Sequence, residues 1–428
     1  MVYSERERLS REELEERQVE RLRETVRRAR EAVPFYAERL EEHGVSAAEI
    51  DSLDYLQTLP TTTKEDFRAE YPDGLFAVDW ADVSRIHASS GTSGKPKIVS
   101  YTDDDLDVWA EVMARSLVAA GVSADDVVQN AYGYGLFTGG LGLHIGLEEI
   151  GAAVVPTGGG GTARQIEMLQ DLESDVLCCT PSYCLYLAEQ AEERGIDPRE
   201  LPLERVVIGA EPFTDPMREE IEAALDVTAV DIYGLSEIIG PGVSIECEHA
   251  QDGLHIWEDH FLPEVVDPQT GKQLPPGEEG ELVLTTLTKE ALPVLRYRTG
   301  DVTALTYETC DCGRTCVRMD NVTGRTDDLL IVRGVNVYPS RIEEEIVAVD
   351  AVAPHYRIDL RRENNLDRIE LTVEHHPSFD GDRDALHQRL HRRVEDALNV
   401  SLDALSVEPP GSIERTEVGK VKRVYDHR

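Results

Sequence analysis

Residues 89–102 read SSGTSGKPKIVSYT, a stretch that places hydroxyl side chains, two glycines and two lysines directly before an apolar run. Glycines let the backbone approach a ligand closely, while the hydroxyls and N–H groups donate hydrogen bonds and the lysines add positive charge. The loop therefore suits an anion such as a nucleotide triphosphate, although taken alone it also suits a simple turn. The pattern argues against an ordinary P-loop ATPase, whose glycines enclose four residues, because Gly91 and Gly94 enclose two and Pro96 follows Lys95.

On both sides of this loop the chain alternates between short apolar runs and helical stretches. From about Val83 to Leu225, the runs DVVQNAYGYG, AAVVPTGGGG, DVLCCTPS and LERVVIGAEP alternate with stretches such as ARQIEMLQDLES. This alternation favours a parallel sheet covered by helices on both faces. Residues Ser4 to Val33 have apolar positions mostly three to five apart and predict one amphipathic helix.

The pattern changes twice toward the C-terminus. Beyond Val227 the apolar runs lie closer together, between turns such as QLPPGEEG, which predicts a more antiparallel, barrel-like subdomain. After a hinge near Asp327, the remainder predicts a small α+β unit. We therefore expect an α/β protein with a large N-terminal domain of mainly parallel sheets flanked by helices, a barrel-like β subdomain and a small mobile α+β domain. The expected boundaries are 1–80 for a helical lead-in, 81–326 for the core and 327–428 for the small domain.

The charge balance is strongly acidic, with 84 Asp and Glu against 43 Lys and Arg and a net charge of −41. A field of this sign repels phosphate backbones, which argues against nucleic-acid binding. Because the acidic residues are spread over the whole chain, they predict a solvated surface adapted to a high-salt cytoplasm. The charged N-terminus does not match a signal peptide, and no apolar run is long enough to span a bilayer. A cytoplasmic protein without membrane contact is expected.

Seven cysteines, an odd number, do not indicate a disulfide framework. The first group lies in apolar surroundings that predict inert core thiols: Cys178, Cys179 and Cys184. The second group predicts a tetrahedral site for structural zinc, formed by Cys247, His255, Cys310 and Cys312. Cys316 or His249 could substitute as a ligand in this set.

Further motifs follow the opening loop in a fixed order: YGLSE at 233–237, YRTGD at 297–301, GRTDDLLIVRGVNVYPSRIEE from Gly324, and GK at 419–420. The ordered series resembles that of the acyl-adenylate-forming superfamily. The residues within its motifs are similar to those of the phenylacetate-CoA ligase branch. The resemblance covers nearly the whole chain, from about Thr61 to Val424. LPTTTKEDFR near the start also matches this branch, although Lys64 there is more simply explained, together with Thr63, as the beginning of a helix.

The resemblance implies a site for ATP. The opening loop would hold the β- and γ-phosphates through Ser90, Gly91, Thr92, Ser93, Gly94 and Lys95. Tyr233 would offer a flat ring to adenine, and Asp301 and Arg325 would contact the ribose and its phosphate edge. The remaining members of the expected nucleotide site are Gly209, Ala210, Glu211, Pro212, Asp231 and Gly234.

Two residues would carry the chemistry. Lys420 would stabilise the charge that builds when a carboxylate attacks the α-phosphate, and Glu237 would bind Mg²⁺, which prefers carboxylate and phosphate oxygens. Each motif also has a plain structural interpretation, such as a solvated basic tail for Lys420 or a turn cap for Asp301. The order and spacing of the whole series favour the functional one.

The acid substrate is expected to bind along AYGYGLFTGGLGLHIG, which starts at Ala131. Its aromatic side chains and glycines suit a flat pocket for an aryl-acetic acid, and they equally suit a well-packed helix entry. The residues expected to line this pocket are Tyr132, Tyr134, Gly135, Phe137 and Gly140.

These expectations describe an ATP-dependent aryl acid–CoA ligase that uses Mg²⁺, forms an acyl-adenylate with release of pyrophosphate, and then transfers the acyl group to CoA with release of AMP. The small domain would move between the two steps. A deazaflavin coenzyme adenylyltransferase of the same branch is an alternative, as is a nucleotide-binding regulator without turnover. The expected partners are the carboxylic acid, ATP and CoA, with a homodimer as the default assembly.

Overall fold

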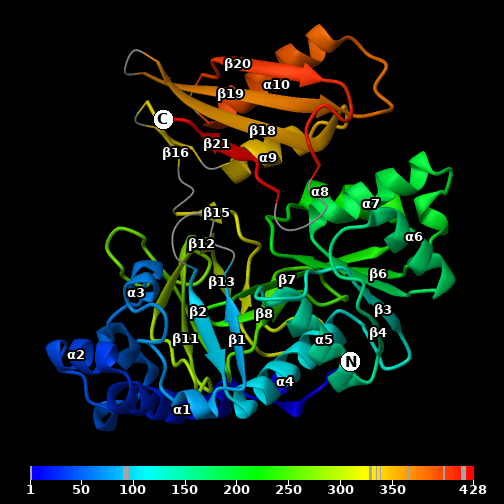
Figure 1. Ribbon diagram of the computed structural model, residues 1–428. Coiled ribbons are helices and arrows are strands. Elements are labelled where there is room, and N and C mark those ends of the chain that lie inside the picture. The colour runs from blue at the N-terminus through cyan, green and yellow to red at the C-terminus, as the bar shows by residue number, and fades with distance from the viewer. Residues whose placement is uncertain are drawn as a thin grey trace.

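The computed structural model describes residues 2–89, 96–326, 330–333, 335–337, 339–363, 366–398, 401–415 and 421–428. Elements from α1 to β15 form a large unit, and the elements from β16 onward form a small unit that stands over one end of it (Figure 1). The loop 90–95, the expected hinge residue Asp327 and the expected catalytic residue Lys420 lie outside the described residues. The domain boundaries given above stay predictions.

The predicted single helix from Ser4 to Val33 is divided into two helices. A short 3₁₀ helix, η1, spans Glu5–Arg8, and α1 spans Arg11–Ala32. Leu9 is extended between them, and the side chains of Ser10 and Glu13 form a capping box that starts α1. The rest of the lead-in consists of α2 (Pro34–Glu42), η2 (Ala47–Glu49), η3 (Leu53–Thr58), α3 (Lys64–Ala69) and η4 (Trp80–Asp82).

Two features of this lead-in follow from its polar residues. Thr63 starts α3 through a capping box with Asp66, as the helix-start interpretation predicts. Glu7 is fully buried, where its carboxylate accepts a hydrogen bond of 2.7 Å from Nε of Arg314, and its backbone oxygen accepts one of 3.1 Å from N of Thr315. The first described residues are therefore fixed to a loop some 300 positions later in the chain.

A nine-stranded sheet forms the centre of the large unit, in the order β13-β14-β9-β8-β7-β6-β5-β3-β4. The strands from β4 to β7 are parallel, and those from β7 to β13 are antiparallel. Their bounds are β3 (Val127–Asn130), β4 (Ala153–Val155), β5 (Val176–Cys179), β6 (Arg205–Gly209), β7 (Thr228–Leu235), β8 (Ile239–Ile245), β9 (Leu254–Ile256), β13 (Leu305–Thr306) and β14 (Arg318–Met319).

Helices cover both faces of the parallel part, because consecutive side chains of a strand point to opposite faces. On β5, Cys178 packs in the core cluster that contains α4 and α5, while Leu177 and Cys179 pack in the cluster that contains α6, α7 and α8. All three thiols of the predicted core group, Cys178, Cys179 and Cys184, are buried in these two clusters. The helices concerned are α4 (Asp103–Ala119), α5 (Gly139–Ile150), α6 (Thr162–Asp171), α7 (Pro181–Glu193), η5 (Pro198–Glu200) and α8 (Asp215–Leu225).

The antiparallel region expected beyond Val227 is shared between two sheets. Its first strand, β7, pairs in parallel with β6 on one side and antiparallel with β8 on the other. This strand therefore joins the parallel and the antiparallel parts of the nine-stranded sheet. A separate four-stranded antiparallel sheet has the order β10-β11-β12-β15, and a two-stranded sheet joins β1 and β2. Their bounds are β1 (Arg85–Ala88), β2 (Ile98–Tyr101), β10 (Phe261–Val266), β11 (Gly280–Thr286), β12 (Tyr297–Thr303) and β15 (Gly324–Arg325).

The small unit is an α+β structure with a core of its own, as predicted. Its main sheet has the order β20-β19-β18-β21, and a hairpin joins β16 to β17. The bounds are β16 (Leu330–Val332), β17 (Val335–Val337), α9 (Pro339–Val347), β18 (Val352–Glu363), β19 (Leu366–His375), α10 (Arg383–Leu398), β20 (Ala404–Glu408) and β21 (Val424–Asp426). Over the described part of the chain, no helix has the length and apolar character that crossing a bilayer requires.

Candidate active site

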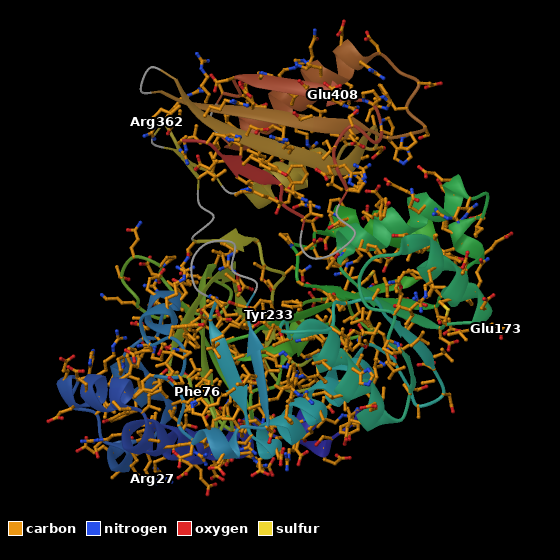
Figure 2. All side chains as sticks on the ribbon, viewed as in Figure 1. Arg27, Phe76, Glu173, Tyr233, Arg362 and Glu408 are labelled. Carbon is orange, nitrogen blue, oxygen red and sulfur yellow. The ribbon has the colours of Figure 1, made fainter. Side chains whose placement is uncertain are left out.

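The expected nucleotide-site residues gather where the parallel strands end. Asn130, Cys179 and Gly209 end β3, β5 and β6, and Tyr233 and Leu235 lie in the last part of β7. Ligands of open α/β sheets bind outside the carboxyl ends of such strands. Figure 2 shows Tyr233 in the part of the large unit that lies toward the small unit, which carries the labelled Arg362 and Glu408.

Tyr233, Asp301 and Arg325 form one hydrogen-bonded group. The hydroxyl of Tyr233 donates to Oδ2 of Asp301 at 2.6 Å, and Arg325 forms an ion pair with Oδ1 of the same carboxylate. The last pair is set by the backbone, because Asp301 on β12 and Arg325 on β15 are direct partners across the two strands. Burial, together with the neighbouring Asp301 carboxylate, raises the pKa of Tyr233 well above its ordinary value, so the ring stays neutral.

Glu237, two residues after β7, is buried and makes two charge-assisted contacts. Its Oε1 pairs with the ammonium of Lys97 and accepts a hydrogen bond of 2.7 Å from the hydroxyl of Tyr297. Burial alone would raise the pKa of Glu237, but Lys97 and Tyr297 outweigh it and the pKa lies below the ordinary value. The side chain is therefore an ionised carboxylate, which is the ligand type that Mg²⁺ prefers.

A buried lysine holds the turn that carries Glu237. The ammonium of Lys289 donates to the backbone oxygens of Ile238 at 2.8 Å and of Glu237 at 3.2 Å, and it lies 4.6 Å from the ring centre of Tyr101. Burial lowers the pKa of Lys289 to about 8, with Asp105 and Glu237 opposing the shift. The position of the Glu237 backbone thus depends on a cation that is hidden from solvent.

The segment 209–212 adopts a tight turn with little free space. A side chain at Gly209 would come within 2.1 Å of the backbone oxygen of Ile232, and Ala210 has a φ of 69°, in the left-handed region. Glu211 accepts hydrogen bonds from Ser182, including its backbone N at 3.3 Å, and one of 2.9 Å from the backbone N of Val421 in the small unit. The carboxylate of Glu211 therefore contacts both units.

Two further expected residues lie on the same strand, β7. At Gly234 a side chain would meet the backbone oxygen of Ile239 at 2.6 Å, so close packing of β7 against β8 requires glycine there. Asp231 is half-buried beside Glu246, and burial together with this second carboxylate raises the pKa of Asp231 well above its ordinary value. The backbone N of Asp231 donates a hydrogen bond of 2.9 Å to Oε2 of Glu246.

The five residues expected to line an acid pocket are divided between interior and surface. The buried Tyr132 donates through its hydroxyl to the backbone oxygens of Cys179 and Gly209, and thereby joins the ends of β5 and β6. The hydroxyl of Tyr134 accepts a hydrogen bond of 2.9 Å from Asn130, and its ring is about one-third exposed. Of the other three residues, Gly140 is buried, Phe137 is half-buried and Gly135 is exposed.

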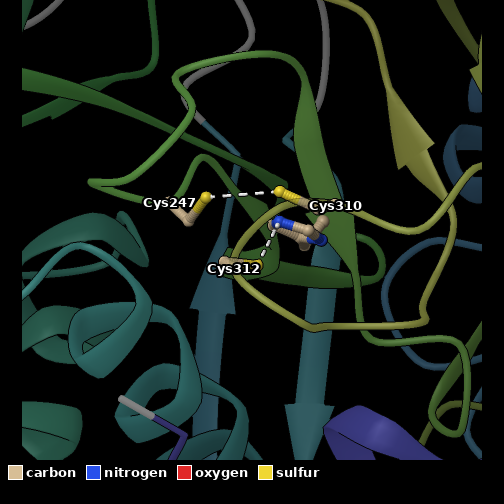
Figure 3. A group of neighbouring side chains, drawn as sticks. Cys247, Cys310 and Cys312 are labelled. Atoms are coloured by element: carbon tan, nitrogen blue, oxygen red, sulfur yellow. Dashed lines mark hydrogen bonds between the residues drawn. The ribbon is translucent and has the colours of Figure 1, made fainter.

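The four residues expected to bind zinc lie together on one edge of the nine-stranded sheet. Their ligand atoms all lie within 4.8 Å of one another, and Figure 3 shows the three labelled cysteines close together. Cys247 follows β8, His255 lies on β9, and Cys310 and Cys312 lie in the loop between β13 and β14.

The distances in this cluster agree with a tetrahedral zinc site. Zinc–sulfur bonds of about 2.3 Å and zinc–nitrogen bonds of about 2.0 Å place two sulfurs about 3.8 Å apart and a sulfur and a nitrogen about 3.5 Å apart. Sγ of Cys247 and Sγ of Cys310 are separated by 3.7 Å, and Sγ of Cys312 lies 3.5 Å from Nε2 of His255. Cys316 lies 3.5 Å from the other ring nitrogen, Nδ1, and so contacts His255 from outside the cluster.

Sequence reasoning missed three of these contacts. The sequence predicts only a general positive charge for Lys97, and the structure pairs it with Glu237. Tyr297 has no expected role in YRTGD, although it begins the same strand as Asp301. Lys289 is preceded by Thr and followed by Glu in TLTKEAL, a pattern typical of an exposed lysine, so no signal in the sequence indicated its burial.

Comparison with protein families gives two matches. Residues 14–287 match the family model of the AMP-binding enzyme, and residues 334–428 match that of the AMP-binding enzyme C-terminal domain. The chain is 52% identical to a phenylacetate-coenzyme A ligase of Thermus thermophilus over 100% of both chains. It is 48% identical to a phenylacetate-coenzyme A ligase of Aromatoleum evansii, over 99% of this chain and 96% of that protein.

A solved relative is similar over the whole chain in two states. The crystal structure of 2-hydroxyisobutyryl-CoA ligase in the postadenylation state, in complex with R3-HIB-AMP, has a TM-score of 0.92 and 29% sequence identity, covering 99% of this chain and 92% of that chain. The structure of the same ligase with 2-HIB-AMP and CoA in the thioesterification state has a TM-score of 0.74 at 29% identity, covering 99% and 91%. The chain is therefore more similar to the first state than to the second.

Proposed function

Since the chain belongs to the AMP-binding enzymes, in their phenylacetate-coenzyme A ligase branch, we propose that its own substrate is an aryl-acetic acid such as phenylacetate. The protein is an ATP-dependent acyl-CoA ligase that works through an acyl-adenylate. The observation that carries the choice of acid is the full-length identity to phenylacetate-coenzyme A ligases. The alternatives of a coenzyme adenylyltransferase and a regulator without turnover are not favoured by these relatives.

In the first half-reaction the acid's carboxylate oxygen attacks the α-phosphorus of ATP, and pyrophosphate leaves with the electrons of the broken P–O bond. We assign adenine to the ring of Tyr233 and the ribose hydroxyls to Asp301, whose two oxygens are oriented by Tyr233 and Arg325. A carboxylate held in this way can accept hydrogen bonds from a vicinal diol. Lys420, outside the described residues, is proposed to stabilise the charge that develops on the α-phosphate oxygens.

Glu237 is proposed as the protein ligand of Mg²⁺. When bound, Mg²⁺ would neutralise charge on the ATP phosphates and so favour departure of pyrophosphate. The carboxylate is ionised, buried and fixed by Tyr297 and by the turn that Lys289 holds. A cation at this carboxylate would replace Lys97 as its partner, which would leave the Lys97 ammonium available to an anion nearby.

In the second half-reaction the CoA thiol attacks the acyl carbon and AMP leaves. We propose that the described arrangement of the two units is the one used for adenylation, because the overall structure agrees better with the relative's postadenylation state than with its thioesterification state. The small unit would then move before CoA reacts. CoA brings its own thiol, so the cysteines of the protein have no part in either step.

The cysteine and histidine cluster is proposed to hold structural zinc. Its four ligand atoms have separations that fit a tetrahedral ion, and the ligands connect the β8–β9 region to the loop between β13 and β14. The cluster is distinct from the Tyr233 and Glu237 groups and needs no role in the reaction. We also infer a cytoplasmic location, where ATP and CoA are available and thiols stay reduced, and a surface adapted to high salt.

The test is a measurement of AMP release with MgATP and a panel of aryl and alkyl acids, each with and without CoA, in high-salt buffer. We expect AMP formation that depends on both the acid and CoA and is strongest with phenylacetate-like acids. A preference for alkyl acids would contradict the proposed substrate class. AMP transfer without any response to acid or CoA would contradict the ligase assignment.

The same assay, divided into half-reactions, tests Lys420. Lys420→Ala should reduce adenylate formation by about 100-fold or more, since it removes a charge that stabilises the transition state, and should affect thioester formation from supplied phenylacetyl adenylate much less. Lys422→Ala, two residues away in the same basic segment, is the matched control and should keep adenylation. Equal loss of both half-reactions in Lys420→Ala would show that its assigned role is wrong.

A further inference from the structure

A second set of contacts between the two units surrounds Glu189, in the last turns of α7. Oε1 of Glu189 lies 2.9 Å from Nε2 of His355 on β18, and Oε2 lies 3.5 Å from Nε of Arg415, which follows β20. One carboxylate of the large unit thus uses both oxygens to contact two basic side chains of the small unit. None of the three residues belongs to the nucleotide site described above.

Arg415 is oriented within the small unit before it meets Glu189. Its guanidinium makes a two-fold contact with Glu374 on β19, at 3.0 Å and 2.8 Å. The carboxylate of Glu374 is buried and also accepts hydrogen bonds from the backbone N of Gly411 and Ile413. A side chain that is already fixed loses little conformational entropy when it binds a partner. The guanidinium of Arg415 is therefore oriented within the small unit before it contacts Glu189.

Charges of opposite sign face each other across this contact. The large unit contributes the carboxylate of Glu189. On α8, burial and this neighbouring carboxylate raise the pKa of the half-buried Glu220 to about 7. The small unit contributes the guanidinium of Arg415, and His355 lies within hydrogen-bond distance of the same Glu189 carboxylate. Burial alone would raise the pKa of Glu189, but His355 and Arg415 outweigh it, and the pKa lies below the ordinary value. Glu189 is therefore anionic where it meets them.

The contact has a defined place relative to the catalytic segment. Glu189 and Ser182 are seven positions apart on α7, about 10 Å or two turns along the same side of the helix. At the Ser182 end, Glu211 accepts the N–H of Val421. Arg415 and Val421 stand on either side of residues 416–420 in the sequence, so both sides of the segment that contains Lys420 are attached to α7 or its neighbour Glu211.

We propose that Glu189 is a positioning residue for the first half-reaction, acting through His355 and Arg415 to hold the small unit in the arrangement that adenylation uses. The inference rests on the proposed function, because it presumes two half-reactions with different arrangements. Glu189 must release both partners when the small unit moves for thioester formation. Its contribution is thus specific to one half-reaction, whereas a merely structural residue would support both.

The test is Glu189→Gln, which keeps the size of the side chain and removes its charge. Adenylate formation, measured as exchange of labelled pyrophosphate into ATP with phenylacetate, should fall by roughly ten-fold, because the arrangement that supports it is less populated. Thioester formation from supplied phenylacetyl adenylate and CoA should stay within about two-fold of the unaltered protein or increase. The ratio of the two rates is the readout that a general loss of stability does not change.

A control on the same helix and a variant from the other unit complete the test. Glu192→Gln alters an exposed carboxylate of α7 and should change neither rate. His355→Gln, made in the small unit, should shift the ratio in the same direction, and the double variant should be no worse than the more affected single one, because both remove the same contact. If Glu189→Gln does not fold, His355→Gln measures the same contact alone.

The outcomes separate this inference from the function on which it rests. If the unaltered protein shows neither half-reaction with phenylacetate, the proposed function fails first. If it shows both and the Glu189 and His355 variants leave the ratio unchanged, or lower both rates equally, Glu189 is not a positioning residue. If the ratio shifts in the predicted direction but the effects of Glu189→Gln and His355→Gln add in the double variant, the two side chains act separately. That result would contradict a role that depends on their contact.

Discussion

At the scale of single residues, the candidate active site depends on buried charges that are each held by an opposite charge or a fixed dipole. Glu237 is ionised because the Lys97 ammonium and the Tyr297 hydroxyl contact its carboxylate. Lys289 fixes the backbone at this position by donating to the backbone oxygens of Glu237 and Ile238. Removing one member of such a group leaves another uncompensated in a poorly solvated place. The effects of substitution should therefore be large at Glu237 and graded at its neighbours.

The first prediction concerns Glu237→Gln. The variant removes the proposed ligand for Mg²⁺ and the partner of Lys97, so the KM for MgATP should rise by about ten-fold or more, equivalent to roughly 1.5–3 kcal/mol. Tyr297→Phe removes one hydrogen bond to the same carboxylate and should have a smaller effect. Glu278→Gln, at an exposed turn before β11, is the control. Unchanged steady-state kinetics in Glu237→Gln would remove this residue from the site.

A second prediction concerns pH and stability at Glu220. Burial, with Glu189 nearby, raises the pKa of Glu220 to about 7, so the folded protein keeps this proton while the unfolded chain loses it near pH 4.5. The folded state therefore loses stability as the pH rises between these values, and the loss is complete above them. Glu220→Gln should increase the free energy of unfolding by less than about 1 kcal/mol near pH 5 and by up to about 3 kcal/mol near pH 8.

Urea denaturation at both pH values measures this difference. The exposed neighbour on the same helix, Glu219→Gln, is the matched control and should show no pH-dependent gain. If the gain for Glu220→Gln were the same at both pH values, its source would be packing and not ionisation.

Short motifs in the sequence were enough to predict that some residues of the candidate site lie near one another. Tyr233 is expected at adenine, and Asp301 and Arg325 at the ribose and its phosphate edge. The structure joins the three residues through hydrogen bonds and strand pairing. The roles of Tyr297 and Lys289 could not be derived, because their partner Glu237 lies more than fifty positions away and only the fold brings them together. The role of each of these residues in catalysis stays a prediction.

At the scale of elements, the alternation of strands and helices predicted the parallel sheet correctly, and local signals explain what it missed. The break before α1 has a signature in SREE, where Ser10 and Glu13 are spaced as in a capping box, so this error could have been avoided. The position of β7 could not be found in the same way. A short apolar run pairs equally well in either direction, and β7 pairs in both.

The third prediction concerns the loop between β13 and β14. The purified protein should contain about one zinc ion per chain. Cys310→Ser should lose the metal and unfold at a lower temperature, because the loop would lose its attachment. Its free energy of unfolding should fall by at least about 2 kcal/mol. KM values should change little. Cys184→Ser, in the core of α7, is the control and should keep the metal. Metal analysis measures the zinc content, and thermal unfolding measures the stability. An unaltered protein that contains no zinc and unfolds no earlier than the zinc-loaded protein would contradict the proposal.

At the scale of the whole molecule, two properties dominate: the arrangement of the two units and the net charge of −41. The sequence predicted a small mobile unit but not which arrangement it adopts, because contacts such as Glu189 with His355 join residues 166 positions apart and carry no local signal. The charge, in contrast, follows directly from composition. Its distribution over many exposed carboxylates implies strong self-repulsion in dilute salt.

The fourth prediction is that stability increases with salt. The screening length falls from about 10 Å at 0.1 M to about 3 Å at 1 M, so repulsion between exposed carboxylates is largely removed over this range. The Tm should rise by several degrees between these KCl concentrations. A variant with Glu12, Glu15 and Glu16 changed to Gln, all exposed on α1, should show a smaller dependence on KCl. A Tm that is flat or falls with KCl would contradict a surface adapted to high salt.

The buried pair of Glu7 and Arg314 has a consequence for how the protein is made. The two residues are separated by 307 positions, so Glu7 leaves the ribosome long before its partner has been synthesised. During this interval the carboxylate must remain in water, since burying it without the guanidinium would cost several kcal/mol. The segment that contains Glu7 can therefore take its final place only after Arg314 has emerged.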